Sequence, residues 1–209
     1  LAHWAPGGGG GSVTCPGNGL GNTFIDQGHL LVIPLEVEHR EWFDSLFSNT
    51  TGYSNTAIGY LSLYSNSTGT LNTAIGQEAL FSNTTGYENT AYGFQSLFSN
   101  TTGRDNTANG AWSLYSNTTG IANTAYGYST LQSNTTGNSN TANGYYALNA
   151  NTTADYNTAN GQYALYANTT GESNTANGAS ALISNITGNY NTANGGSSLY
   201  NNTTGNNNT

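Results

Sequence analysis

The residues of this chain with the clearest chemical meaning are asparagines that recur every 17 residues, each followed two places later by threonine. Asn-x-Thr without an intervening proline is the acceptor sequence for N-linked glycosylation. The residue between Asn and Thr varies, as Ser67 and Ile186 show, whereas the Thr never does. The pattern predicts a row of covalent N-linked glycans. The ten acceptor candidates are Asn49, Asn66, Asn83, Asn100, Asn117, Asn134, Asn151, Asn168, Asn185 and Asn202.

A second interpretation of these asparagines stays open at this point. Asn and Thr side chains at a turn can satisfy backbone groups and stack on one another without any sugar. Glycans on every coil would also be crowded, because adjacent strands lie only about 4.8 Å apart. The sequence therefore predicts either a glycan row or a bare polar ladder.

Other reactive side chains form no recognisable constellation. His3, His29 and His39 lack metal-ligand spacing with the single Cys15, which either pairs with another molecule or stays free. The repeats contain no Ser-His-Asp pattern, phosphate loop or clustered carboxylate pair for acid–base catalysis. We therefore expect no enzymatic activity, no cofactor and no metal.

Charge and hydropathy exclude further classes of partner. The net charge is −8, only 6% of residues are charged, and Arg40 and Arg104 are the only strong bases. Without a basic patch we expect no nucleic acid. No apolar run approaches the roughly 20 residues of a membrane helix, so we expect no membrane insertion. Because the chain starts at Leu1 without Met, either a leader was removed or the beginning is missing, and we predict an extracellular or cell-surface location.

The elements that position these residues follow from an internal repeat. Nine consecutive 17-residue copies span residues 55–207, and a tenth begins at Asn208; residues 72–88 read NTAIGQEALFSNTTGYE. Numbered from its first Asn, each unit has Ala at position 3, Gly at position 5 and Leu at position 9. Such a fixed period is the signature of stacked repeats, and the Gly, Asn and Thr content argues against helix. We predict an all-β protein, a β-solenoid (β-roll) of about nine to ten coils.

Within each coil we expect two short strands, near positions 2–4 and 7–11, with glycines at positions 5 and 15 making the turns. Strand alternation would place Leu at position 9 on one face and positions 8 and 10 on the other. One Leu and one Ala per coil make a thin interior, so ladders of identical side chains must supply the remaining stability. Position 10 is usually aromatic, and at Ala154, the one departure from glycine at position 15, we expect a kink.

Composition divides the chain into three parts. Residues 1–37 hold a Gly-rich linker and the strand-like segment HLLVIPLEV, either a cap or a strand donated to a neighbour. Residues 38–54 form a degenerate first coil, and residues 55–209 the regular repeats. No cap follows the tenth copy, so either the chain continues or a second subunit covers this end. The candidate assembly residues are Leu30, Leu31, Val32, Ile33, Leu35 and Val37.

The N-T-A-I-G text at 55–59 and 72–76 resembles the N-S-x-A-x-G units in the heads of trimeric autotransporter adhesins. The N-T-A-x-G…L…N-T-T-G pattern is also similar to repeats of bacterial, phage or viral surface-fibre proteins. This resemblance covers residues 46–209 and implies a β-solenoid. The adhesin unit is usually shorter, and no heptad stalk or membrane anchor follows in this chain.

The leading functional hypothesis is a structural subunit of an extracellular fibre, stacked head to tail on copies of itself and N-glycosylated once per repeat. The alternative is a trimeric adhesin, or a viral or phage fibre shaft, that binds carbohydrate or a host surface. A minor alternative is an ice-binding solenoid, although the Thr residues at positions 2, 13 and 14 are expected beside turns rather than on a flat Thr-x-Thr strand.

Overall fold

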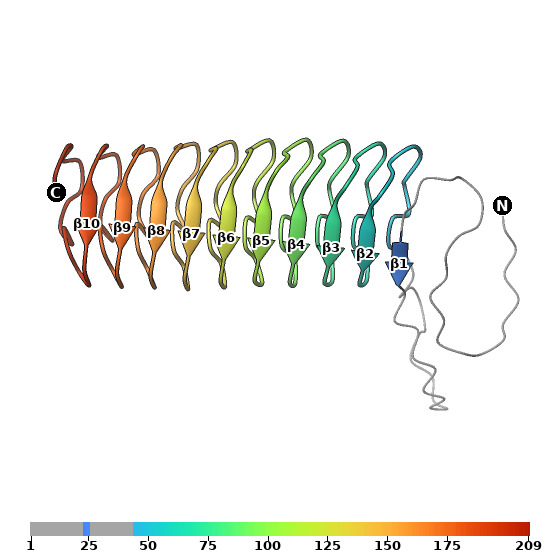
Figure 1. Cartoon of the computed structure of the whole chain (residues 1–209), viewed down its shortest axis with the longest axis horizontal. Helices are drawn as coiled ribbons and strands as arrows, with labels where there is room; N and C mark the ends of the chain where they lie inside the picture. Colours follow the sequence, from blue (N-terminus) through green and yellow to red (C-terminus); the bar gives the residue numbers. More distant parts are fainter. Residues whose placement is uncertain (1–22, 26–43) are drawn as a thin grey trace, which may run out of the picture.

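The structure is a computed structural model that describes residues 23–25 and 44–209. The chain winds into a rod of stacked coils, each of which contributes one strand to a single parallel sheet along the rod (Figure 1). The sheet has ten strands in chain order, and the predicted all-β solenoid with a 17-residue period is confirmed. The strands are β1 Thr23–Ile25, β2 Thr56–Ile58, β3 Thr73–Ile75, β4 Thr90–Tyr92, β5 Thr107–Asn109, β6 Thr124–Tyr126, β7 Thr141–Asn143, β8 Thr158–Asn160, β9 Thr175–Asn177 and β10 Thr192–Asn194.

Each of the strands β2 to β10 occupies positions 2–4 of its unit, as predicted. Strand pairing keeps the repeat in register, so that Thr56 pairs with Thr73 and Ala57 with Ala74. The alanines at position 3 are buried, while positions 2 and 4 are at least partly exposed on the outer face. Ala suits the inner position because successive coils leave little room there.

The second predicted strand, at positions 7–11, is wrong. These residues form turns in every coil, and positions 7 and 9 adopt the left-handed backbone region, as does position 17. Twenty-nine non-glycine residues of the described chain have φ between 47° and 61°. Neighbouring coils fix this conformation: the left-handed Leu63, for example, donates its backbone N–H to the carbonyl of Ala79 in the next coil at 3.0 Å.

The residues that occupy these left-handed positions share one property, which is that none of them is Thr, Val or Ile. A branched Cβ is the side chain that this backbone region tolerates least. The exclusion stands out in a chain that has Thr at positions 2 and 14 of every complete unit. The absence of Thr, Val and Ile from these positions is a sequence signal of the turns, and the prediction of a second strand did not take it into account.

The two repeated glycines serve different purposes. Gly at position 5 has φ between 114° and 141°, which side chains rarely adopt, so the turn prediction holds there. Gly at position 15 has no such φ; a Cβ on Gly86, for example, would collide with the carbonyl of Gly103 and with Asn83. Position 15 is therefore small because two coils and a side chain converge on it.

The kink expected at Ala154 is absent. Strands β7 and β8 on either side keep the regular register, with Thr141 opposite Thr158. The carbonyl of Ala154 also accepts the same pair of side-chain hydrogen bonds that the glycine carbonyls accept elsewhere, from Asn140 at 2.8 Å and from Asn151 at 3.1 Å.

The first coil is built differently from the prediction. Its second half, from Leu46 onward, hydrogen-bonds to the next coil in the chain, for example from Leu46 to Ser62, as expected. The strand that pairs in parallel with β2 on this side is β1, which lies inside the segment 1–37. The signal was present in the sequence, because Asn22-Thr23-Phe24-Ile25 repeats the Asn-Thr-x-Ile of Asn55 to Ile58. The sheet therefore begins with a strand that precedes the first complete unit in the chain.

The apolar core is a narrow column along the axis of the rod. It consists of Ala at position 3, Leu at position 9 and the small residue at position 8, so positions 8 and 9 both face inward and the predicted alternation fails. Turn geometry explains the failure, because only extended backbone sends successive side chains to opposite faces. The thin core itself was correctly predicted.

The left-handed strain predicts an unusual effect of glycine. Ala122 is exposed at position 17 with φ of 58°. Replacing Ala122 with Gly should raise the free energy of unfolding by about 0.5–1 kcal/mol, whereas Ala122→Val should lower it by about 1 kcal/mol or more. Urea unfolding followed by circular dichroism measures both.

Ala111 provides the matched control, because it lies at position 6 of a repeat and is not among the left-handed residues. Ala111→Gly should lower the free energy of unfolding by about 0.5–1 kcal/mol. Glycine substitutions with the same sign at both sites would contradict the left-handed assignment.

Candidate functional site

The asparagines at position 12 form a buried ladder, here called the second ladder. From Asn66 to Asn185 all eight members have no exposed surface, and Asn49 and Asn202 at the ends are half-buried. Each side-chain Nδ2 from Asn66 onward donates to Oδ1 of the equivalent Asn in the preceding coil, at 2.8–3.2 Å. The same nitrogen also donates to the carbonyl of position 15 in its own coil; for Asn83 and Gly86 the distance is 3.0 Å.

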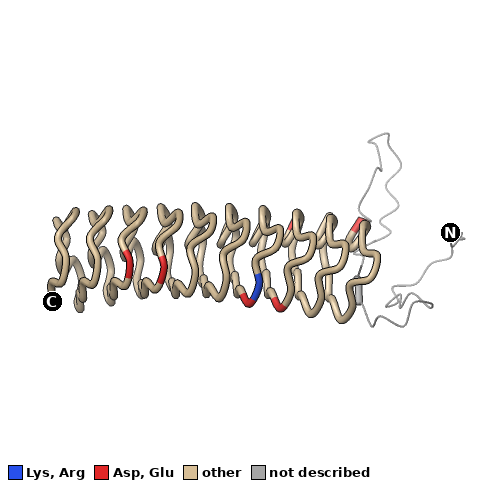
Figure 2. Tube along the Cα trace, turned by 90° about the horizontal axis from the view of Figure 1, so that it is seen from above, with Lys and Arg blue, Asp and Glu red and all other residues tan. Residues whose placement is uncertain are grey.

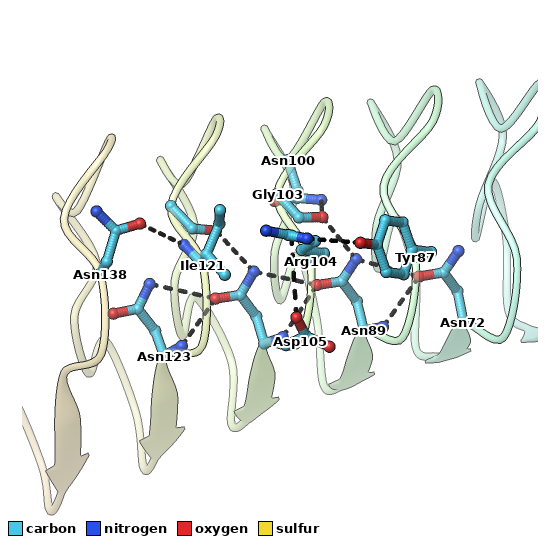
Figure 3. A network of polar contacts seen from close by, with 12 residues as sticks. Asn72, Tyr87, Asn89, Asn100, Gly103, Arg104, Asp105, Ile121, Asn123 and Asn138 are labelled. Atoms are coloured by element: carbon cyan, nitrogen blue, oxygen red, sulfur yellow. Dashed lines mark hydrogen bonds and ion pairs between the residues drawn. The ribbon is translucent and has the colours of Figure 1, made fainter.

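A first ladder is formed by the asparagines at position 1, which are also buried (Figure 3). Asn72 donates to Oδ1 of Asn55 from its backbone nitrogen at 3.0 Å and from Nδ2 at 3.2 Å. Its Nδ2 also donates to the carbonyl of Gly86 at 2.8 Å. The position 15 carbonyl is therefore the junction of both ladders, which explains why the chain approaches itself so closely there.

This geometry argues against the predicted glycan row. Both hydrogens of each Nδ2 in the interior of the second ladder are donated to buried carbonyl oxygens, so a sugar on that nitrogen would displace a hydrogen bond and enter the core. This argument applies to Asn66, Asn83, Asn100, Asn117, Asn134, Asn151, Asn168 and Asn185. Asn49 and Asn202 are less buried, yet their Nδ2 atoms also donate, to Gly52 and Gly205. These contacts favour the bare polar ladder, and the glycan row stays a prediction that intact mass tests.

The two hydroxyl positions that follow the second ladder differ. The Ser or Thr at position 13 donates its hydroxyl to the position 13 carbonyl of the next coil, as Thr84 does to Thr101 at 3.0 Å. Thr at position 14 is exposed in all ten coils, and its hydroxyl has no hydrogen-bond partner in the described chain. The exchange of Thr for Ser67 at position 13 follows because either hydroxyl can make this bond. Ile186 has no hydroxyl and makes only the backbone contacts, and nothing in the structure explains why position 14 is always Thr.

Aromatic rings at position 10 stack along the N-terminal part of the rod. Five of them, from Phe47 to Tyr115, form an aromatic column with centroids 5.1–5.3 Å apart and planes within 7°. The prediction of an aromatic ladder at this position is confirmed for these coils. It ends at Gln132, whose side chain accepts a hydrogen bond from Asn149 in the next coil instead.

A second aromatic group, which we call the aromatic belt, covers the turn face of five successive coils. Its rings come mainly from positions 6 and 7 and touch in a continuous chain with centroids 4.6–6.2 Å apart. Sequence reasoning missed the belt because neither position is consistently aromatic from copy to copy. The belt consists of Phe94, Trp112, Tyr128, Tyr145, Tyr146, Tyr163 and Tyr166.

One buried polar atom in the coils of the belt lacks a partner, and one phenol of the belt has a shifted pKa. Ser129 at position 7 is fully buried, and its Oγ is the only buried side-chain polar atom of the described chain without a partner. The rings around Tyr145 remove water from its hydroxyl and raise the pKa of that group.

Charged side chains are few on the described part of the rod (Figure 2). Most lie at positions 16 and 17, where Arg104 approaches Asp105 at 4.0 Å and donates to the hydroxyl of Tyr87 at 2.6 Å. A side-chain hydrogen bond with Asp105 on the next coil raises the pKa of the Glu88 carboxyl. Exposed groups of this kind contribute little to stability.

Several predicted features lie outside the described residues. They are the candidate assembly residues Leu30, Leu31, Val32, Ile33, Leu35 and Val37, together with Cys15 and the three histidines. Among the residues that the structure describes, no group of His, Cys, Asp or Glu could hold a metal ion. The described chain also has no helix long and apolar enough to cross a membrane.

No protein-family model matches this chain, and comparisons with curated proteins and with solved structures also give no match. The fold defines the chain as a β-solenoid repeat protein. Its function must therefore be argued from the ladders, the aromatic surfaces and the charge distribution.

The two interpretations of Asn-x-Thr can be separated by one pair of variants. Asn117→Ala should lower the free energy of unfolding by about 2–4 kcal/mol, because Asn100 and Asn134 both lose a buried partner. Thr119→Ala destroys the same acceptor triplet but removes only an exposed hydroxyl, so it should change stability by less than about 0.5 kcal/mol. Chemical denaturation gives both values, and intact mass gives the occupancy. Equal effects of the two substitutions, or extra mass lost in both, would support a glycan instead.

Proposed function

We propose that this protein is a structural subunit of an extracellular fibre, in which the solenoid serves as a stiff rod and stacks head to tail on copies of itself. Location outside the cell is part of the proposal and rests on the resemblance of the repeats to surface-fibre proteins. The proposal does not include the glycan row, for which the buried asparagines leave no room.

The observation that carries the proposal is the directionality of the coil-to-coil contacts. Each interior coil presents Asn Oδ1 acceptors to the next coil and Nδ2 donors to the preceding one, as Asn100 does between Asn83 and Asn117. The two faces of a coil are thus complementary to each other. A coil can therefore be followed by another coil of the same chain or by the first coil of a second chain. The contact with a second chain is heterologous, and such contacts generate open filaments.

Two further features suit a mechanical role. The described coils are tied together by backbone bonds, two asparagine ladders and the aromatic column, so bending would strain several rows of contacts at once. The sheet also runs unbroken along the described coils, so each coil is tied to the next by parallel strand pairing.

The adhesin or fibre-shaft alternative predicts a closed trimer rather than an open filament. A trimer has one mass in solution, whereas a filament has many. Sedimentation velocity at increasing protein concentration therefore discriminates between the two.

The ice-binding alternative also stays a prediction, with one correction. Thr at position 2 does not lie beside a turn; it lies on the outer face of the sheet in strict register, for example Thr141 opposite Thr158. The other outward residue of each strand is Ile, Tyr or Asn, so the face carries a single threonine row. A thermal-hysteresis measurement tests this function, and activity lost in Thr158→Tyr but kept in Thr153→Tyr, an exposed threonine at position 14, would support it.

The proposed rod makes a length prediction. Deleting residues 123–139, one complete unit, should leave a folded protein whose rod is shorter by one coil, about 4.8 Å. In a head-to-tail filament the axial repeat should shrink by the same amount, which helical reconstruction from electron micrographs measures.

Deleting eight residues, 123–130, is the control, because it breaks the 17-residue period and should prevent the downstream coils from stacking in register. Protein that remains a single short rod at millimolar concentration would contradict the fibre proposal. An unchanged axial repeat after the one-unit deletion would contradict head-to-tail stacking.

A further inference from the structure

The aromatic belt is the largest group of exposed rings on the rod that the stacking of coils does not explain. Phe94 is 38% exposed, Tyr128 37%, Tyr145 45% and Tyr166 37%. Contiguous exposed apolar surface of this kind usually marks a contact site in soluble proteins. Elsewhere on the described rod the most exposed tyrosines, such as Tyr156 and Tyr190, have no ring partner and stand singly.

Charge is excluded from the belt although the rod itself is acidic. The described residues include six acidic side chains and one arginine. In the coils that carry the belt, residues 89–173, the charged residues are Arg104, Asp105, Asp155 and Glu172, all at positions 16 and 17. The ring positions of the belt therefore carry no charge, so two rods of equal charge can approach along this face with little repulsion.

The arrangement of the rings argues against a sugar as the partner. Within the belt, rings pack mostly edge to face: Tyr145 meets Tyr146 at 78° and Tyr163 at 85°. Their faces are thus largely engaged by other rings of the belt, and stacking on a pyranose would need free faces. The T-shaped packing that prevails within the belt is also a favourable geometry for contact with further rings.

Periodicity identifies the source of those rings. Successive rings of the belt follow the coil spacing, with Tyr128 and Tyr145 stacked 5.5 Å apart and Tyr146 and Tyr163 stacked 5.8 Å apart. Only a partner with the same repeat can meet the belt coil by coil along its length. A second copy of this chain has that repeat and the same neutral face.

We propose that the aromatic belt is a lateral interface that pairs two copies of this rod side by side. The pairing deepens the proposed fibre function and rests on it, because it would bundle filaments sideways while the coil ends extend them. A twofold interface is the commonest way to pair identical surfaces. A twofold axis through the coil of Tyr128, the middle coil of the belt, brings Trp112 of one rod opposite Tyr146 of the other.

The repeat itself supplies substitutions that remove the belt without disturbing the coil. Tyr128→Ala and Tyr145→Gln introduce residues already present at position 6, as Ala111 and Gln162 show. Tyr163→Ser introduces the serine that occupies position 7 at Ser180. The triple variant Tyr128→Ala, Tyr145→Gln, Tyr163→Ser should therefore keep the circular dichroism spectrum and unfolding transition of a folded solenoid.

The control variant removes three exposed tyrosines that lie off the belt. Tyr92→Asn, Tyr156→Ser and Tyr190→Ser again use residues found at the same repeat positions, and these tyrosines are 55%, 64% and 63% exposed. The control loses as many phenol rings as the belt variant, so a general loss of surface hydrophobicity affects both proteins alike.

Sedimentation equilibrium of the full chain tests the proposal. The unmodified protein and the control should pair with the same dissociation constant, and the belt variant should pair at least about tenfold more weakly. Raising the salt concentration should strengthen pairing, because it screens repulsion between two acidic rods. Equal association by the belt variant and the control, or pairing that salt weakens, would overturn the proposal.

Electron micrographs separate this test from that of the fibre function. Single unbundled filaments in the belt variant, with the same length distribution as the control, support the belt and the fibre together. Filaments of the unmodified protein that never associate sideways overturn the belt while leaving the fibre intact. Paired short rods that never extend support the belt and contradict head-to-tail stacking.

Discussion

The structure depends on the hydrogen bonding of buried asparagine amides between coils. A coil of 17 residues with one Leu and one Ala as its fixed apolar residues has too little apolar area to offset the entropy of ordering it. Two asparagines per coil fill the remaining interior, and each is satisfied only when a neighbouring coil is present, as Asn72 is by Asn55 and Asn83 by Asn66. Stability is therefore a property of the stack rather than of the coil.

This constraint explains which positions of the repeat vary and which do not. Positions 1, 12 and 15 meet at one carbonyl and tolerate almost no change, and left-handed positions accept many side chains but no branched Cβ. Positions such as 4, 6, 7 and 16 differ from copy to copy, and they determine most of the surface chemistry of the rod. The aromatic belt and the sparse charges both occupy such variable positions.

The sequence was sufficient to predict the solenoid, its period, the strand at positions 2–4, the thin core and the aromatic rows at position 10. It misled at positions 7–11, where apolar residues suggested a strand although the coil closes through left-handed turns. The sequence also favoured a sugar at Asn117 and its equivalents, because Asn-x-Thr is the sequence of a glycan acceptor and of this amide ladder alike. The two differ in whether the asparagine is buried, which the sequence does not state. The contribution of β1 was missed because 33 residues, rather than 17, separate Thr23 from Thr56.

Hydrogen exchange of the asparagine side-chain amides, followed by NMR, tests the central claim most directly. The account predicts that both Nδ2 hydrogens of Asn100, Asn117 and Asn134 exchange as slowly as the backbone amide of Leu114, which the same stack of coils protects. Side-chain amides that exchange at the rate of exposed asparagine, or that retain one hydrogen because a sugar replaces the other, would contradict it.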